Sequence, residues 1–169
     1  DRPDPACSAR GVRYRTDGGA EGVVEAELLL DASGQSGLVS RALKLRRWDT
    51  FFRNLAVYGY YRGSDRLPDP DETNIFIESY EGGWTWNIPL ADRMASVGVV
   101  VDSDTAQQGI AESGLAAYFQ EQVKRAPHTS RMLAGAALET GPFVVKDWSY
   151  TSEQVLGDGW VLVGDAACF

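Results

Sequence analysis

Two short turns and one aromatic run hold the residues of this sequence whose types and spacing suit chemistry. The first turn, Asp31-Ala32-Ser33-Gly34, follows the apolar residues 28–30, and the second, Gly164-Asp165, follows the apolar residues 160–163. Glycine allows a ligand to approach the backbone closely, and a carboxylate at the end of a buried parallel strand can accept hydrogen bonds from sugar hydroxyls. On these residues alone, the alternative for the first turn is an ordinary strand-to-helix connection, and Asp165 is equally a helix cap.

The aromatic run is Gly83-Trp84-Thr85-Trp86-Asn87-Ile88-Pro89. Side chains alternate along a strand, so Trp84, Trp86 and Ile88 are expected on one face. Pro89 lacks an N–H and is expected to end the strand's hydrogen bonding. Two neighbouring indoles form a rigid apolar wall that suits an aromatic ring or a lined channel, and ordinary core packing is the alternative.

The apolar pattern predicts the elements that must position these residues. A hairpin is expected from strands at 11–16 and 22–30, because the intervening Asp17-Gly18-Gly19 is a strong turn signal. Helices are expected at 36–47 and at 104–125, the second ending before Pro127. Further strands are expected at residues 52–61, 74–80, 83–89, 95–102, 142–148 and 160–163.

A run of antiparallel strands therefore lies between two segments that read as pieces of a parallel sheet. We predict an α/β fold with α+β character in this stretch, in which a β-meander substrate region is inserted into a nucleotide-binding domain. The expected boundaries are 1–47 and 151–169 for the nucleotide-binding part and 48–150 for the insertion. A sequence that closes on an apolar strand and a turn is expected to be an internal part of a longer chain.

Composition excludes several classes of function. The chain has 169 residues and a net charge of −8, which argues against nucleic acid as a partner. No apolar run approaches the roughly 20 residues of a membrane helix, so no membrane partner is expected. Two cysteines, Cys7 and Cys168, cannot form a disulfide framework or a zinc cluster, and they fit a reducing, cytoplasmic compartment.

Two groups of basic side chains have plain interpretations. His128 is the single histidine, which argues against a histidine metal site or a catalytic triad, so no metal is expected. It is expected on the surface at a helix end. Arg41, Lys44, Arg46 and Arg47 form a basic cluster, read either as the favourable end of a helix or as a phosphate or carrier-protein patch.

Three motifs in this order resemble the flavin-dependent halogenases. They are D-A-S-G-Q-S-G at 31–37, W-x-W-x-I-P at 84–89 and G-D-A-A-C-F at 164–169. Halogenases belong to the FAD-dependent monooxygenase superfamily with the para-hydroxybenzoate-hydroxylase type of fold. The first and last motifs are shared across that superfamily, and W-x-W-x-I-P is typical of the halogenase branch.

The resemblance implies an FAD-binding Rossmann-like domain and assigns roles by position. The residues expected at FAD are Asp31, Ser33, Gly34, Gly164 and Asp165, with Asp165 on the ribityl chain. Those expected along the passage between flavin and substrate are Trp84, Trp86, Ile88 and Pro89. The family's G-x-G-x-x-G fingerprint and catalytic lysine have no counterpart here, and Lys44, Lys124 and Lys146 do not match the lysine's position.

The reaction implied uses reduced FAD from a separate flavin reductase, O₂, and chloride or bromide to halogenate an electron-rich aromatic substrate. The short meander resembles the halogenases of phenolic, pyrrole or carrier-bound substrates. One alternative is an FAD-dependent aromatic hydroxylase or related flavin reductase of the same fold, which would share both turns but lack W-x-W-x-I-P. Another is a non-enzymatic β-rich binding module with the indoles as a ligand shelf.

Overall fold

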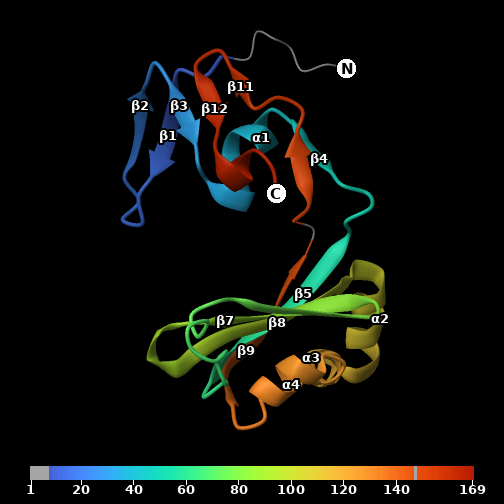
Figure 1. The fold of residues 1–169 in the computed structure, drawn as a ribbon. Helices are drawn as coiled ribbons and strands as arrows, with labels where there is room; N and C mark the ends of the chain where they lie inside the picture. Colours follow the sequence, from blue (N-terminus) through green and yellow to red (C-terminus); the bar gives the residue numbers. More distant parts are fainter. Residues whose placement is uncertain (1–7, 147) are drawn as a thin grey trace. The chain divides into compact units, whose positions relative to one another are not determined.

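The chain divides into two compact units, which are described separately. The computed structural model describes residues 8–146 and 148–169. One unit holds the described residues up to Phe51 together with Trp148–Phe169, and the other holds residues 52–146 (Figure 1). Cys168 is an exposed free thiol, while Cys7 lies outside the described residues. Within the described part of the chain, no helix combines the length and apolar character needed to cross a bilayer.

The first unit contains the expected hairpin and a small parallel sheet. Strands β1 (Gly11–Arg15) and β2 (Glu21–Glu25) pair antiparallel, which confirms the hairpin. The expected strand 22–30 is interrupted after β2 and resumes as β3 (Leu29–Asp31). Strand β3 pairs in parallel with β12 (Trp160–Leu162), and β11 (Leu156–Gly157) lies antiparallel to β12. The predicted parallel α/β character is therefore confirmed.

The helix expected at 36–47 is largely wrong. A 3₁₀ turn, η1 (Gly34–Ser36), leads to the short helix α1 (Leu38–Ala42), and residues 46–48 form strand β4 (Arg46–Trp48). Strand β4 pairs antiparallel with β10 (Tyr150–Ser152), which follows just over a hundred residues later and gives β4 its partner. This pairing with a distant strand overrides the local helical periodicity. A local sequence pattern contains no information about such a contact.

The second unit is an antiparallel sheet. Among its described residues, five strands lie in the order β6-β7-β8-β5-β9. Strands β6, β7 and β8 are consecutive along the chain, which confirms the predicted meander, and β5 and β9 extend it at one side. Strand β9 begins five residues before the expected residue 142. The bounds are β5 (Asn54–Arg62), β6 (Phe76–Tyr80), β7 (Gly83–Pro89), β8 (Met94–Asp102) and β9 (Ala137–Lys146).

Helices cover one face of this sheet (Figure 1). They are α2 (Ser103–Ser113), α3 (Leu115–Lys124) and α4 (Pro127–Met132). The single helix expected at 104–125 is divided at Gly114, and Pro127 begins a helix, because a missing N–H costs nothing in a first helical turn. The core between the layers includes the fully buried Val57, Val97, Val99 and Phe119.

One carboxylate joins the sheet to α4. Glu78 accepts hydrogen bonds from the backbone N–H groups of His128 (3.0 Å) and Thr129 (2.7 Å) and from the Thr129 hydroxyl (2.9 Å). The Thr129 hydroxyl also meets that of Thr85 at 2.7 Å. His128 is exposed, as expected, but lies at the start of a helix. Burial raises the pKa of Glu78, and the hydrogen bonds from Thr129 and His128 outweigh it and lower the pKa overall.

Replacing Glu78 should therefore cost stability in a pH-dependent way. We expect Glu78→Gln to lower the free energy of unfolding by about 1–2 kcal/mol near neutral pH, because charged acceptors make stronger hydrogen bonds. A folded-state pKa below the ordinary 4.5 means that this stabilisation is present above that value and is lost as pH falls through the folded-state pKa.

Urea unfolding of the wild-type protein and of Glu78→Gln, at neutral pH and near pH 3, measures the difference in their free energies of unfolding. Glu81→Gln is the matched control, because this neighbouring glutamate is exposed. A similar loss for the two variants, or a loss that is unchanged in acid, would contradict the role of Glu78.

Candidate functional site

The parallel pairing of β3 and β12 brings two turns together that are far apart in the sequence. Leu162 lies opposite Asp31 in the register, and the Val163 N–H donates to the Asp31 carbonyl at 2.9 Å. The turn η1 follows β3, and a second 3₁₀ turn, η3 (Gly164–Ala166), follows β12. Both turns therefore lie against each other at the carboxyl ends of neighbouring parallel strands, where open α/β sheets bind ligands.

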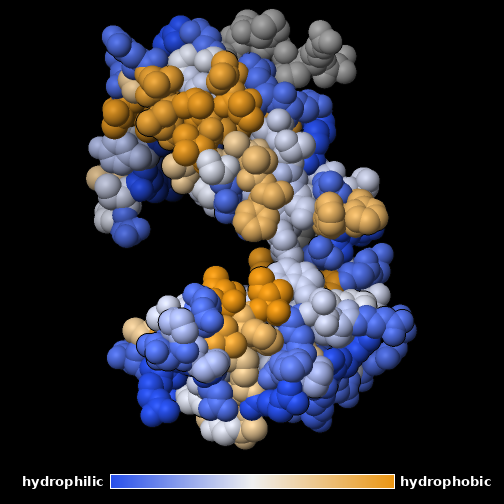
Figure 2. All heavy atoms as spheres, viewed as in Figure 1, coloured by the Kyte–Doolittle hydropathy of each residue, from blue (hydrophilic) through white to orange (hydrophobic). Residues whose placement is uncertain are grey.

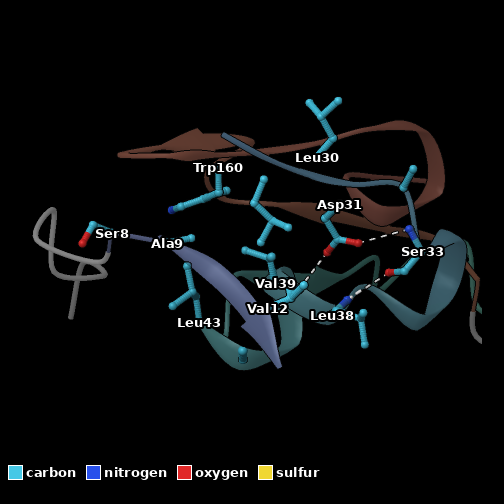
Figure 3. Close-up of a pocket in the computed structure, with 13 residues that line it drawn as sticks. Ser8, Ala9, Val12, Leu30, Asp31, Ser33, Leu38, Val39, Leu43 and Trp160 are labelled. Carbon is cyan, nitrogen blue, oxygen red and sulfur yellow. Dashed lines mark hydrogen bonds between the residues drawn. The ribbon is translucent and has the colours of Figure 1, made fainter. Parts of the chain in front are cut away.

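Asp31 and Ser33 use their side chains to shape the first turn. Asp31 is only 4% exposed, and its two carboxylate oxygens accept from the backbone N–H of Ser33 (3.1 Å) and of Val39 (2.7 Å). The Ser33 hydroxyl accepts from the Leu38 N–H at 3.0 Å (Figure 3). Burial raises the pKa of Asp31, but the hydrogen bonds from Ser33 and Val39 prevail and lower it. The Asp31 carboxylate therefore stabilises the backbone of the turn that follows it.

Two glycines leave the backbone bare at these turns. Gly34 has a φ of 62° and Gly164 a φ of 58°, in the left-handed region that favours glycine. Apart from each glycine and its two chain neighbours, no described residue has a heavy atom within 4 Å of the position that a Cβ would take at either glycine. The turns are thus open on the side where a side chain would stand, and a ligand has access to their peptide groups.

Asp165 is the candidate whose carboxylate remains available. It is half-buried directly after Gly164, and among the described residues its side chain has no hydrogen-bond or ion-pair partner. The capping position of η3 is Val163, and no side chain caps this turn. Within the part of the chain that is described, Asp165 therefore makes none of the contacts that the cap interpretation requires.

Sequence reasoning missed two side chains that hold both turns. The guanidinium carbon of Arg46 lies 3.9 Å from the centroid of the Tyr150 ring, and Arg46 donates to the Gln35 carbonyl in η1 at 2.9 Å. The Tyr150 hydroxyl donates to the Asp165 carbonyl in η3. Arg46 stood out only as one member of a basic cluster, and nothing in the local sequence pairs it with Tyr150.

The structure corrects the interpretation of that cluster. Arg46 and Arg47 lie on β4 and not at the end of a helix, because residues 46–48 pair with β10. Arg47 forms an ion pair with Glu153 at 2.6 Å. Alignment with a helix dipole therefore does not account for these two arginines.

The aromatic run forms β7, and its indoles face away from the helices. Thr85 is fully buried and Asn87 is 3% exposed on the helical side, whereas Trp84 is 37% exposed on the other side. Trp86 and Ile88 share the face of Trp84, as alternation predicts. Pro89 is the last residue of the strand. The indoles thus lie outside the core that the sheet forms with its helices.

Other rings extend the indoles into what we call the open aromatic face. Its members are Tyr58, Tyr60, Trp84, Trp86 and Phe143. Ring centroids lie 5.9 Å apart for Trp84 and Trp86, 6.2 Å for Trp86 and Tyr58, and 5.5 Å for Tyr58 and Phe143. Tyr58 and Tyr60 lie on the face of β5 opposite to that of the buried Leu55 and Val57, and no motif in the sequence marks the two tyrosines as functional.

An apolar groove adjoins the first turn within its own unit. Its volume is about 590 Å³, and Asp31 and Ser33 are among its lining residues (Figure 3). Leu30 and Leu38 on its rim are 61% and 68% exposed. Figure 2 shows that apolar side chains gather on the viewed surface of this unit. The D-A-S-G turn therefore combines a bare glycine with an apolar wall.

Comparison with known proteins defines the class to which this fold and these motifs belong. The family model for tryptophan halogenase matches residues 10–169. The chain is 35% identical to the tryptophan 2-halogenase of Chondromyces crocatus over 154 residues, which cover 89% of this chain and 29% of the relative. It is also 35% identical to a 1H-pyrrole-2-carbonyl peptidyl-carrier-protein chlorinase of Pseudomonas fluorescens, covering 86% of this chain and 33% of the relative.

Solved structures of flavin-dependent halogenases share the fold. The myxobacterial chondrochloren halogenase CndH matches with a TM-score of 0.85 and 38% identity over 96% of this chain and 38% of its own. CmlS, a flavin-dependent halogenase, matches with a TM-score of 0.84 and 33% identity over 100% of this chain and 30% of its own.

The chain therefore belongs to the tryptophan halogenase family. The expected resemblance and fold class are both confirmed. The chain spans about a third of the length of the curated relatives it matches.

The different surroundings of Asp31 and Asp165 predict different effects on stability. We expect Asp31→Ala to lower the free energy of unfolding of the 169-residue chain by about 2–3 kcal/mol, because it removes two partly buried charge-assisted hydrogen bonds. Asp165→Ala should change it by no more than about 0.5 kcal/mol. Urea unfolding followed by circular dichroism compares the two, and equal losses would contradict this division.

Proposed function

We propose that this chain is the part of a flavin-dependent halogenase that holds the ribityl side of FAD and shields the oxidant. Its substrate is an electron-rich aromatic compound of the phenolic, pyrrole or carrier-bound type. The observation that carries the proposal is the open aromatic face, in which both indoles of W-x-W-x-I-P turn away from the core. An aromatic hydroxylase of the same fold has no need of this motif, and family membership favours the halogenase.

The residues present at the two turns fit FAD. Gly34 and Gly164 expose peptide groups, and Asp165 offers a carboxylate with no partner among the described side chains. A carboxylate in that position is an acceptor for the hydroxyls of a sugar-like chain. We infer that Gly34, Gly164 and Asp165 contact the cofactor directly, while Asp31 and Ser33 hold the first turn in shape.

When bound, reduced FAD supplies the electrons with which O₂ converts a halide into hypohalous acid. The overall reaction consumes reduced FAD, O₂, halide, one proton and an aromatic C–H, and it yields oxidised FAD, the aryl halide and two waters. If hypohalous acid escapes from the protein, it reacts with nucleophiles dissolved in the surrounding water. Trp84 and Trp86 therefore have a physical task, which is to line its path with rings that exclude water.

The partners of the reaction follow the same proposal. Relatives that act on tryptophan and on a carrier-bound pyrrole are each 35% identical to this chain, in keeping with an electron-rich ring as substrate. A separate flavin reductase, a chloride or bromide co-substrate and a cytoplasmic location remain predictions.

In the full-length enzyme, Asp165→Ala should weaken FAD binding. A charge-assisted hydrogen bond contributes about 1.5–3 kcal/mol, so Kd should rise roughly ten- to a hundredfold. Titration followed by flavin fluorescence measures Kd, and thermal unfolding of the apo-protein on the same preparation separates binding from folding. Asp165→Asn is the matched control: it retains an acceptor oxygen and should show a smaller increase. An unchanged Kd for Asp165→Ala would contradict the assignment.

Truncating the indoles should release the oxidant. We expect Trp84→Ala and Trp86→Ala to lower aryl halide formed per O₂ consumed by roughly ten- to a hundredfold, because misplaced groups lose positioning. Hypohalous acid trapped in bulk solvent by monochlorodimedone should rise in step. Thr85→Ala is the control on the same strand, since its hydroxyl is buried on the helical side and contacts Thr129. It should cost stability without releasing oxidant, and equal release from all three variants would contradict the wall.

A further inference from the structure

We propose that Gly98 is a positioning residue for Trp86. Because Gly98 has no side chain, the indole of Trp86 can lie across β8 and make the open aromatic face continuous. The inference rests on the proposed function, because Trp86 matters for the reaction only if the indoles line the path of the oxidant. Gly98 belongs to none of the motifs that identify the family, and it lies on β8, the central strand of the sheet.

The register places Gly98 under the aromatic face. It lies opposite Trp86 of β7 and opposite Tyr58 of β5, so the three residues form one row across the sheet. Its neighbours along β8, Val97 and Val99, are fully buried on the helical side. Alternation therefore directs the missing side chain of Gly98 toward the indole.

The space above Gly98 is filled by Trp86. A Cβ at Gly98 would lie 2.6 Å from Cε2 of the indole and closer still to Cζ2 and Cη2. These are atoms of the indole's benzene ring, which therefore lies directly over the backbone of β8. No real Cβ tolerates such contacts, so any other residue at this position must displace the indole. An isolated glycine within a strand is a recognised sign of a close approach.

A hydrogen bond also holds the indole, through its N–H. Trp86 Nε1 donates to the Ser96 hydroxyl at 3.2 Å, and Ser96 lies two residues before Gly98 on the same face of β8. The indole is thus held by packing at one residue and by its N–H at another. In this position its ring reaches Tyr58, with centroids 6.2 Å apart, and Tyr58 continues the row to Phe143 on β9.

The consequence is a continuous wall. The indole bridges the central strand, which itself carries no ring in this row, and joins Trp84 to the rings of β5 and β9. Without the seat at Gly98, the row would be divided between β7 and β5. Gly98 acts on the proposed reaction only through the position of Trp86.

A double-mutant cycle in the full-length enzyme tests the inference. Gly98→Ala is made in the wild type, in Trp86→Phe and in Trp84→Phe, since phenylalanine lacks the outer part of the indole and Trp84 faces Val100. The assay supplies reduced FAD, O₂ and bromide, with monochlorodimedone in bulk solvent as the probe, and measures escaped oxidant per O₂ consumed. Indole N–H resonances report the position of Trp86.

We expect Gly98→Ala to shift the Trp86 N–H resonance and to raise escaped oxidant roughly tenfold in the wild type and in Trp84→Phe. In Trp86→Phe it should add little. Ser96→Ala keeps the glycine and serves if Gly98→Ala does not fold: it should raise escaped oxidant by about two- to tenfold, the worth of one hydrogen bond.

Two results would overturn the inference in different ways. If Gly98→Ala acts equally in the wild type and in Trp86→Phe, Gly98 does not act through the indole, although the proposed function stands. The second result is that Trp86→Phe itself releases no oxidant, while Gly98→Ala in the wild type still shifts the Trp86 N–H resonance. In that case the proposed function of the indoles fails, and the inference fails with it.

Discussion

The parallel pairing of β3 with β12 is the interaction on which the candidate cofactor site depends. It joins segments from the two ends of the described chain and places two glycine turns side by side. Each turn alone offers only a few peptide groups. Their juxtaposition joins the bare backbone of one turn to the carboxylate of Asp165 on the other.

Polar contacts around that pairing distinguish the side chains that shape the turns from the one that remains available to a ligand. Both carboxylate oxygens of Asp31 accept hydrogen bonds from nearby backbone N–H groups. Arg46 on β4 and Tyr150 on β10 each donate a hydrogen bond to one of the two turns. The carbonyl of Asp165 accepts a hydrogen bond, and its carboxylate has no hydrogen-bond or ion-pair partner among the residues that the structure describes. Two aspartates that look equivalent in the sequence thus take different parts, and hydrogen bonding separates them.

Much of this arrangement is predictable from the sequence where the signal is local. Alternation in β7 correctly placed Trp84, Trp86 and Ile88 on one face, and the turn at 17–19 correctly predicted a hairpin. The segment 36–47 went wrong because its last residues pair with β10, a contact that periodicity does not encode. Pro127 was read as a stop and is a start, since both are compatible with a missing N–H.

What lay beyond prediction was contact between distant residues. The Arg46–Tyr150 stack and the seat of Trp86 on Gly98 each depend on a register that only the folded sheet defines. Glycine in a strand signals a close approach, but the sequence does not say which group approaches.

The pairing of β4 with β10 has a consequence for how such a chain can change. The chain leaves the first unit after β4 and returns to it at β10, and Trp48 and Tyr150 lie opposite each other in that ladder. The whole second unit is thus one continuous insertion between β4 and β10. The pairing of these two strands holds the start and the end of the insertion one strand spacing apart. The five-stranded sheet can therefore be lengthened, reshaped or exchanged as a cassette, while the frame that carries the two turns keeps its own geometry.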